Sequence, residues 1–342
     1  MGQSNRQWIV AQASQSPGIG LERACFGQRD GAIPGPGVGQ ILIRNGWFAC
    51  DPMNHAWVKG LEARFSPIPV GGIMRGGVAG RVVESRHPDF APGDAVTGFL
   101  DWADYTLSTG GVDYTGTPLQ KLPADLSPAS GLATLGMTGH CAWLGLFDIG
   151  RPRPGDTVVV SGAAGAIGTV AVQLARLAGC RVIGIAGGPR KCSFLLKELG
   201  IDAAIDYQRE NVAERLRETC PSGIDVFFDN VGGVVLDTAL TCLARGARVV
   251  VCGGISGYNS AAHGLTNHLM LAIQGATMAG FFYFDHVHRL AEINARLADL
   301  LRSGDLREVL DVAEGFDSVP DAALGQFQGK NLGKQLVRIA AI

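Results

Sequence analysis

A glycine- and alanine-rich turn follows a short β-branched run and precedes an apolar stripe at helical spacing. Ala163, Gly165 and Gly168 occupy the three positions of an A-x-G-x-x-G pattern. Small residues there let the backbone approach a pyrophosphate, and the following helix N-terminus offers free N–H groups and a positive dipole end. The same spacing also suits the packing of a strand on a helix, so the residues that follow must decide between the two interpretations.

The next predicted strand ends without an acidic residue. An NAD-binding unit usually carries an acid there, about 20 residues after the glycine turn, to hold the ribose hydroxyls. Here Gly187 and Gly188 leave room, and Arg190 and Lys191 follow. Two cations in that place suit a 2′-phosphate, so the sequence predicts NADP(H) as the cofactor.

The elements that must position these residues alternate between strand and helix from Asp156 onward. The apolar runs predict strands over residues 157–160, 181–186, 203–206, 224–228, 248–252 and 277–283. Helices are predicted over 166–178, 190–199, 211–219, 234–244, 264–273 and 285–304. Near-continuous apolar strands have both faces covered, which indicates a doubly wound parallel sheet in an α/β fold.

Glycine and polar residues gather where these strands end. Tyr207, residues 229–233 and residues 252–259 each follow a predicted strand. Ligands of such sheets bind beyond the carboxyl ends of the strands, so these segments are predicted to line one site. Several such strand ends carry more weight than the glycine pattern alone.

Residues 1–127 show short strand-like runs broken by Gly and Pro instead of long helical stripes. Strands are predicted over 7–10, 40–44, 77–83, 94–98 and 101–108, in a β-rich, partly barrel-like domain. Residues 127–130 are typical of a helix start, and a mostly apolar helix over 131–146 is expected to bridge two domains. A last strand over 335–339 is expected to return to the first domain.

Composition excludes several classes of protein. The chain has 342 residues, 18% of them charged and 46% hydrophobic, which excludes disorder as its main state. Its formal net charge of −2 provides no basic field for nucleic acid. No run reaches the roughly 18 apolar residues of a membrane span, and residues 1–20 lack a signal-peptide core. We therefore expect a cytoplasmic protein.

The cysteines and histidines do not predict a metal site. None of the eight cysteines forms a C-x-x-C pair, and structural zinc needs clustered ligands. Cys50 with His55, or His286 with His288, does not supply the three convergent ligands of catalytic zinc. The sequence predicts reduced, mostly buried cysteines and no metal.

Together these residues resemble a known family. The likeness covers nearly the whole chain and is carried by residues 5–8, 87–90, 135–139, 164–168, 228–233, 252–259 and 330–334. The chain resembles the zinc-independent medium-chain dehydrogenase/reductase superfamily, in its prostaglandin reductase, 2-alkenal (double-bond) reductase and curcumin reductase group. The resemblance implies a GroES-like β-rich substrate domain over 1–127 and 306–342, and an NADP-binding Rossmann domain over 128–305. It also implies reduction of a carbon–carbon double bond conjugated to a carbonyl, with NADPH as the hydride donor.

The resemblance assigns residues one by one. Gly165, Ala166, Ile167 and Gly168 match the pyrophosphate turn, and Lys191 and Tyr207 match the 2′-phosphate contacts. The remaining cofactor contacts are matched by Asn230, Cys252, Gly253, Ile255, Ser256, Tyr258, Phe281, Phe282, Tyr283 and Asn331. Tyr258 also matches the tyrosine beside the reacting carbonyl and is the candidate catalytic residue. Considered without their context, Lys191 would be a solvated helix residue, Asn230 a turn residue, and Tyr207 and Tyr258 packing residues. The position of Lys191 just past the second predicted strand favours the cofactor contact.

The candidate substrate contacts depart from the family pattern. Where the family commonly reads D-P-Y-M-R, this chain has Met53 and His55 in place of the tyrosine and the arginine. Trp143 stands where the family often has tyrosine. These departures leave the substrate open, while the reaction class follows the family.

Two alternatives remain beside an enal or enone reductase. A quinone is a vinylogous enone, so an NADPH quinone reductase is the second enzyme interpretation. A non-catalytic NADPH-binding regulatory protein is the third, because the segment around Met53 is altered. The expected partner is a small molecule, and the family implies a homodimer.

Overall fold

The computed structural model describes residues 4–14, 21–60, 64–257 and 264–342, and it divides into two compact units. The first unit comprises Met1–Gly136, Leu310–Asn331 and Gln335–Ile342, and the second comprises Met137–Val309 and Leu332–Lys334. The boundaries thus differ from the expected 127/128 and 305/306. Residues 128–136 stay with the first unit because Ala129 and Leu132 pack in a core cluster with residues of its sheet.

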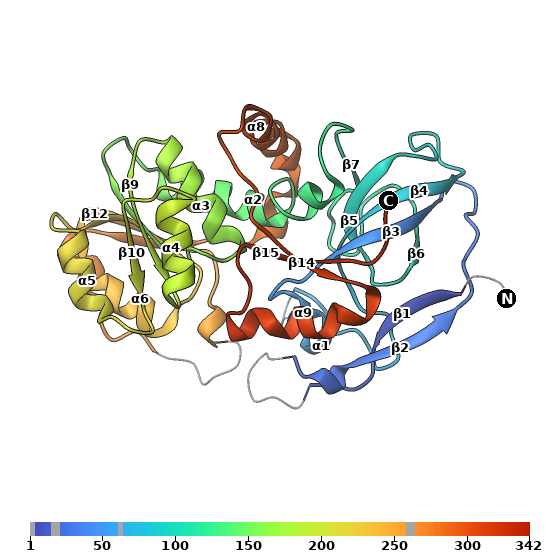
Figure 1. The fold of residues 1–342 in the computed structure, drawn as a ribbon, viewed down its shortest axis with the longest axis horizontal. Coiled ribbons are helices and arrows are strands. Elements are labelled where there is room, and N and C mark those ends of the chain that lie inside the picture. The colour runs from blue at the N-terminus through green and yellow to red at the C-terminus, as the bar shows by residue number, and fades with distance from the viewer. Residues whose placement is uncertain (1–3, 15–20, 61–63, 258–263) are drawn as a thin grey trace. The chain divides into compact units, whose positions relative to one another are not determined.

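A six-stranded parallel sheet forms the centre of the second unit (Figure 1). Its strands are β8 (Thr157–Ser161), β9 (Arg181–Ala186), β10 (Ala203–Asp206), β11 (Ile224–Asp229), β12 (Leu243–Val251) and β13 (Thr277–Gly280). They lie in the order β10-β9-β8-β11-β12-β13, and neighbours pair in parallel. This is the strand order of a Rossmann sheet, with its topological switch point beside β8. The predicted doubly wound parallel sheet is confirmed.

Among the described residues, the second unit contains seven α-helices in addition to this sheet. They are α2 (Met137–Trp143), α3 (Ala166–Leu177), α4 (Pro189–Lys197), α5 (Val212–Thr219), α6 (Gly233–Leu240), α7 (Leu269–Gln274) and α8 (Leu290–Ser303). On one face of the sheet, Ile183, Phe227 and Val249 pack with Leu216 of α5 and Leu240 of α6. The burial of these apolar side chains is the main stabilising contribution to the unit.

Four predicted helices of the second unit have different bounds. The helix expected over 264–273 begins at Leu269, and the α-helix expected over 285–304 begins at Leu290 after a 3₁₀ turn. The helix expected over 131–146 is a 3₁₀ turn (Pro128–Leu132), then α2, then a π-helix (Leu144–Gly150). A tight turn separates the first two, since a Cβ at Gly136 would lie 2.5 Å from the carbonyl oxygen of Gly131. The helix expected over 234–244 ends at Leu240, because Leu243 already pairs with Ile224 as the start of β12.

The first unit is built on antiparallel strands. They are β1 (Asn5–Val10), β2 (Phe26–Gly31), β3 (Ile41–Ala49), β4 (Arg75–Ser85), β5 (Ala95–Asp101), β6 (Tyr105–Ser108), β7 (Gln120–Lys121), β14 (Leu310–Glu314) and β15 (Lys334–Arg338). The larger sheet has the order β14-β15-β3-β4-β5-β7, with β6 on β3, and β1 and β2 form a separate pair. The helices α1 (Asn54–Lys59) and α9 (Val319–Gly325) were not predicted, because one or two turns are too short for a periodic signal.

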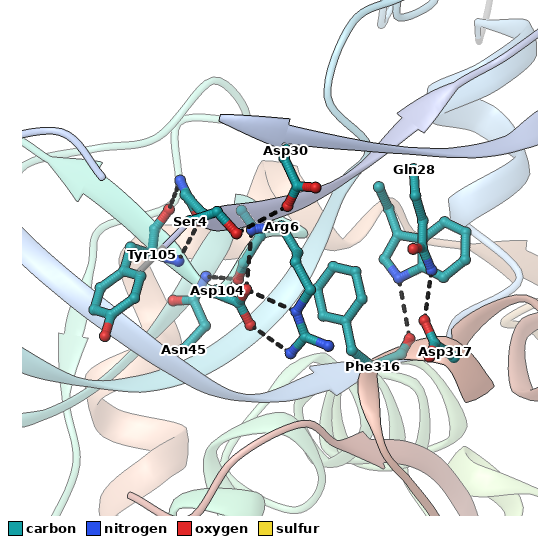
Figure 2. A network of polar contacts seen from close by, with 12 residues as sticks. Ser4, Arg6, Gln28, Asp30, Asn45, Asp104, Tyr105, Phe316 and Asp317 are labelled. Carbon is teal, nitrogen blue, oxygen red and sulfur yellow. Dashed lines mark hydrogen bonds and ion pairs between the residues drawn. The ribbon is translucent and has the colours of Figure 1, made fainter. Parts of the chain in front are cut away.

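Asn5, Arg6 and Trp8 hold β1 within the first unit through their side chains, and Figure 2 shows the contact between Arg6 and Asp104. The side chain of Asn5 exchanges hydrogen bonds of 3.0 and 2.9 Å with the backbone of Tyr105. Arg6 binds Asp104 through two 2.9 Å hydrogen bonds, and Trp8 donates 3.1 Å to the carbonyl of Phe316. These residues, which carried part of the family resemblance, therefore have a structural role.

Among the described residues, no helix has both the length and the apolar character that a membrane crossing requires.

Candidate active site

In the glycine turn between β8 and α3, the backbone approaches itself too closely to admit larger side chains. Gly162 has a φ of +58°, and a Cβ at Gly168 would lie 2.2 Å from the carbonyl oxygen of Gly162. Gly165 is the N-cap of α3, and Ala166, Ile167 and Gly168 form its first turn. The first turn of a helix leaves N–H groups without intrahelical partners, so this end of α3 suits an anion.

The tail of the chain packs beside this turn. The amide of Gly333 donates a 2.8 Å hydrogen bond to the carbonyl of Ala164, and Gly165 and Gly333 form an isolated parallel bridge. Lys334 follows and is only 2% exposed. Asn331, an expected cofactor contact, is the last residue of the first unit before residues 332–334 join the second.

The residues expected at the 2′-phosphate follow β9 and β10. A Cβ at Gly187 would lie 3.0 Å from the phenol oxygen of Tyr207, so these two residues are neighbours. Tyr207 is 51% exposed, and Lys191 lies half-buried in the first turn of α4. The carboxylate of Asp206 accepts from the amides of Gly188 and Gln208 at 2.8 and 3.1 Å, which fixes both loops.

A buried polar cluster joins the ends of β8 and β11. Ser161 donates a 2.6 Å hydrogen bond to Asp229, and its oxygen accepts from the amide of Asn230 at 2.9 Å. The Asn230 Nδ2 donates 2.8 Å to the carbonyl of Ser161, while its buried Oδ1 has no hydrogen-bond partner among the described residues. Burial raises the pKa of Asp229, against which hydrogen bonds from Ser161, Gly232 and Val231 act.

The segment after β12 is bonded to the segment after β11. The amides of Cys252 and Gly253 donate to the carbonyl of Asp229 at 2.9 and 3.1 Å. Ser256 donates to the carbonyl of Val231 through its amide at 3.1 Å and its hydroxyl at 2.6 Å, and Ile255 donates to Asn230 at 3.4 Å. A hydrogen bond with Cys141 and burial raise the pKa of the Cys252 thiol.

Phe281, Phe282 and Tyr283 follow directly after β13, which ends at Gly280. Tyr283 is buried and Phe281 and Phe282 are half-buried, and the 3₁₀ turn Tyr283–Arg289 begins there. The strand expected over 277–283 is therefore shorter by these three residues. The turn ends the strand before they can pair.

The structure brings most predicted cofactor residues to one edge of the parallel sheet. Residues after β8, β9, β10, β11, β12 and β13 all lie beyond carboxyl ends of strands in that sheet. Tyr258, the candidate catalytic residue, lies outside the described residues. Trp143 ends α2 in the second unit, with its ring 4.6 Å from that of Phe147.

The other two candidate substrate residues belong to the first unit. Met53 precedes α1 and is half-buried, and His55 lies within α1 with 4% exposure. The ring of His55 contacts that of Phe327 edge-on at 6.4 Å. Burial, then the charge of Lys59, lowers the pKa of His55 to about 4.

Sequence reasoning assigned no role to several polar residues that shape the site, although Asp229 lies in a segment that was predicted to line it. Asp206, Ser161 and Asp229 hold the loops by hydrogen bonds, and each is the last residue of its strand. A polar residue ending an apolar strand was the available signal. His140, fully buried in α2, gave none, because a lone histidine in an apolar helix is typical of packing.

The residues present fit a dinucleotide. Gly168 admits no side chain, the first turn of α3 is suited to a phosphate, and a buried acceptor of Asn230 awaits a donor. The described residues contain no group of three His, Cys, Asp or Glu side chains that could hold a metal ion.

Comparison with known proteins gives two matching family models. One, described as "Zinc-binding dehydrogenase", matches residues 166–301, and the other, "N-terminal domain of oxidoreductase", matches residues 6–113. The two matches fall in the second and the first unit respectively.

Similar proteins cover nearly the whole chain. The NADPH-dependent curcumin reductase of Escherichia coli is 34% identical over 99% of this chain and 98% of its own length. The NADP(+)-dependent 2-alkenal reductase of Nicotiana tabacum is 34% identical over 89% and 88%. The crystal structure of CurA from Vibrio vulnificus in complex with NADPH has a TM-score of 0.89 at 35% identity, covering 98% of this chain and 100% of that one.

These likenesses agree with the β-rich first unit and the Rossmann sheet of the second. The chain therefore belongs to the zinc-independent medium-chain dehydrogenase/reductase superfamily, in the group of the curcumin, 2-alkenal and prostaglandin reductases.

Proposed function

We propose that this protein reduces the carbon–carbon double bond of α,β-unsaturated aldehydes or ketones. It is an NADPH-dependent oxidoreductase by its family and by its near-full-length similarity to NADPH-dependent reductases. The observation that carries the reaction class is the similarity to a 2-alkenal reductase along nine-tenths of the chain. The first unit is the GroES-like domain, and we assign substrate binding to it.

When bound, NADPH would supply a hydride to the β carbon of the substrate, and the α carbon would take a proton from the hydrogen-bond donor at the site or from water. Negative charge develops on the carbonyl oxygen after the hydride transfer, and the protein must provide a hydrogen-bond donor there and exclude water. We assign the donor role to Tyr258, with a cofactor ribose hydroxyl as the second candidate. A phenol has a reference pKa near 10 and is therefore protonated at neutral pH.

The chain's own residues bind and orient the cofactor in this proposal. Gly165, Ala166, Ile167 and Gly168 bind the pyrophosphate through backbone amides. Lys191 and Tyr207, beside Gly187, bind the 2′-phosphate. Asn230 accepts a hydrogen bond from the cofactor through its buried Oδ1.

The remaining cofactor contacts are assigned to the segments after β12 and β13 and to the tail. The residues are Cys252, Gly253, Ile255, Ser256, Phe281, Phe282, Tyr283 and Asn331. Met53, His55 and Trp143 are assigned to the substrate. Holding nicotinamide and alkene in contact is itself a large part of the catalytic effect.

We also propose a homodimer that pairs through β13. This edge strand is exposed along its length, and Leu269 and Ile273 of the neighbouring α7 are exposed apolar residues. An exposed edge strand presents unpaired N–H and C=O groups to a second chain. Sedimentation velocity of Met278→Lys and of the native chain tests this. A monomer is expected for the variant, and an unchanged dimer would exclude β13 as the interface.

A cytoplasmic location stays a prediction, which cell fractionation tests.

Steady-state oxidation of NADPH with a panel of enals, enones and quinones tests the function. Turnover with enals and enones, with the saturated carbonyl compound as product by mass spectrometry, is the expected result. Turnover with quinones alone would make it a quinone reductase. NADPH binding without turnover of any substrate would favour the regulatory alternative.

Elemental analysis of protein purified without added metal is expected to find less than about 0.1 zinc per chain, because zinc sites need clustered ligands.

A further inference from the structure

A fully buried histidine of α2 makes two directed hydrogen bonds. His140 is 0% exposed, and its Nε2 lies 2.6 Å from the amide oxygen of Asn294 in α8. Its Nδ1 lies 3.4 Å from the phenol oxygen of Tyr283. Because an amide oxygen only accepts, Nε2 carries the proton and Nδ1 accepts from the tyrosine. Burial lowers the pKa of His140 to about 4, which keeps the ring neutral at pH 7.

The same histidine also stacks on Tyr283. The two ring centroids are 5.9 Å apart with an interplanar angle of 6°, and Tyr283 is 5% exposed. Tyr283 stands three residues beyond the end of β13, at the carboxyl edge of the sheet. The polar chain from Asn294 through His140 to Tyr283 therefore fixes where the backbone turns after this strand.

The next residue of α2 acts in a similar way on the neighbouring segment. The thiol of Cys141 is buried and hydrogen-bonds that of Cys252, which directly follows β12. Two successive residues of one short helix thus contact the segments after β12 and after β13. Both segments carry residues assigned above to the cofactor.

We propose that His140 is a positioning residue for the nicotinamide half of NADPH, acting through Tyr283 on residues 281–283. The inference rests on the proposed cofactor site and goes beyond it, because His140 is not among the residues assigned to the cofactor. Loss of the His140 ring removes one hydrogen-bond partner from the phenol hydroxyl of buried Tyr283 and one from the amide oxygen of half-buried Asn294. Tyr283 then shifts toward a new partner, and the segment after β13 moves with it.

The test compares two ligands on four proteins. The native chain, His140→Leu, Tyr283→Phe and the double variant are titrated with NADPH and with adenosine 2′,5′-bisphosphate, which lacks the nicotinamide. Each single variant is expected to weaken NADPH about 3- to 10-fold, the scale of one hydrogen bond, and to leave the fragment within about 2-fold. The double variant is expected to have the same NADPH dissociation constant as the weaker-binding single variant, because both substitutions remove the same interaction.

A core variant separates positioning from general loss of stability. Leu216→Ala removes a fully buried side chain of α5 that packs in a core cluster with Ile183 and Phe227, to which His140 and Tyr283 do not belong. It is expected to lower the melting temperature while the ratio of the two dissociation constants stays at the native value. Tyr283→Phe removes a single oxygen, so it tests the inference even if His140→Leu does not fold.

Three results would overturn the inference. They are equal weakening of NADPH and the fragment, unchanged NADPH binding in both single variants, and additive effects in the double variant. Binding is measured without substrate, so a native chain that binds NADPH but reduces no enone would refute only the proposed function.

Discussion

A 2.6 Å hydrogen bond from Ser161 to Asp229 joins the ends of two neighbouring strands, β8 and β11. The Asp229 carboxylate also accepts from the amides of Val231 and Gly232 at 3.0–3.1 Å. The glycine turn follows Ser161, and the Asn230 segment follows Asp229. One buried carboxylate therefore ties together two loops of the cofactor site.

Ser161→Ala is expected to destabilise the protein by about 1–3 kcal/mol, because it leaves the buried Asn230 amide and Asp229 oxygen each short of a partner. Urea unfolding of the native chain and the variant measures this difference. Ser193→Ala, at a half-buried position of α4, is the control and is expected to change the free energy of unfolding by less than about 0.5 kcal/mol. Equal stability of Ser161→Ala and the native chain would contradict the role of the cluster.

Lys191→Ala is expected to weaken NADPH about 10- to 150-fold and to affect NADH little, since a charge-assisted contact contributes about 1.5–3 kcal/mol. Isothermal titration with both cofactors measures the selectivity. Lys197→Ala removes an exposed cation at the last turn of the same helix and is the matched control. The assignment of Lys191 to the 2′-phosphate fails if the two variants bind NADPH alike.

Two buried histidines make stability depend on pH. Burial lowers the pKa of His55 and of His140 to about 4, whereas an unfolded histidine titrates near 6.5. The unfolded state therefore binds more protons between these values, and the free energy of unfolding falls as the pH drops from 6.5 to 4. The loss is up to about 3 kcal/mol for each histidine.

The difference between the native chain and His140→Leu isolates one of these titrations from all other groups. Urea unfolding at a series of pH values is expected to give the variant a slope smaller by up to one proton in this range. Parallel curves for the two proteins would show that His140 titrates alike in the folded and unfolded states.

Met53→Tyr is expected to change the relative kcat/KM values among enones. The dissociation constant of NADPH is expected to stay within about 2-fold, which is less than about 0.5 kcal/mol of binding free energy. Met53 is half-buried and lies in the first unit, whereas the glycine turn lies in the second. His55→Arg is a poor test of the same idea, because burying a charge at a 4% exposed position costs stability. An equal change with every substrate would make Met53 part of the scaffold only.

Tyr258→Phe is expected to lower turnover roughly 10- to 1,000-fold, which is the scale of one lost oxyanion donor. NADPH affinity is expected to stay within about 5-fold, since the ring remains and one lost hydrogen bond corresponds to about 1 kcal/mol. Both quantities are measured on one purified variant. Full turnover would make Tyr258 a packing residue, and a collapse of NADPH binding would make it a cofactor residue.

Much of the second unit could be predicted from sequence alone. Buried parallel strands are continuous apolar runs, and β8, β9, β10 and β11 agree with their predicted ranges to within one residue. The glycine turn was predictable for the same local reason, because only small residues fit its backbone. These features depend on short-range sterics, which the order of residues determines directly.

Other boundaries depended on contacts between distant residues. β12 begins at Leu243 because it pairs with Ile224, and residues 128–136 join the first unit through packing. Short elements such as α1 and α9 form on a completed core, without a period of their own. Local propensity does not decide such cases.

The sequence by itself determined the family, the parallel sheet and which strand ends carry glycine, lysine and asparagine. Only the tertiary structure decided how those ends are held: Asp229 on Ser161, Asp206 on Gly188, and His140 between Tyr283 and Asn294. The sequence separations in these pairs range from 18 to 154 residues. A hydrogen bond over such a separation depends on where folding brings two side chains, which spacing along the chain does not determine.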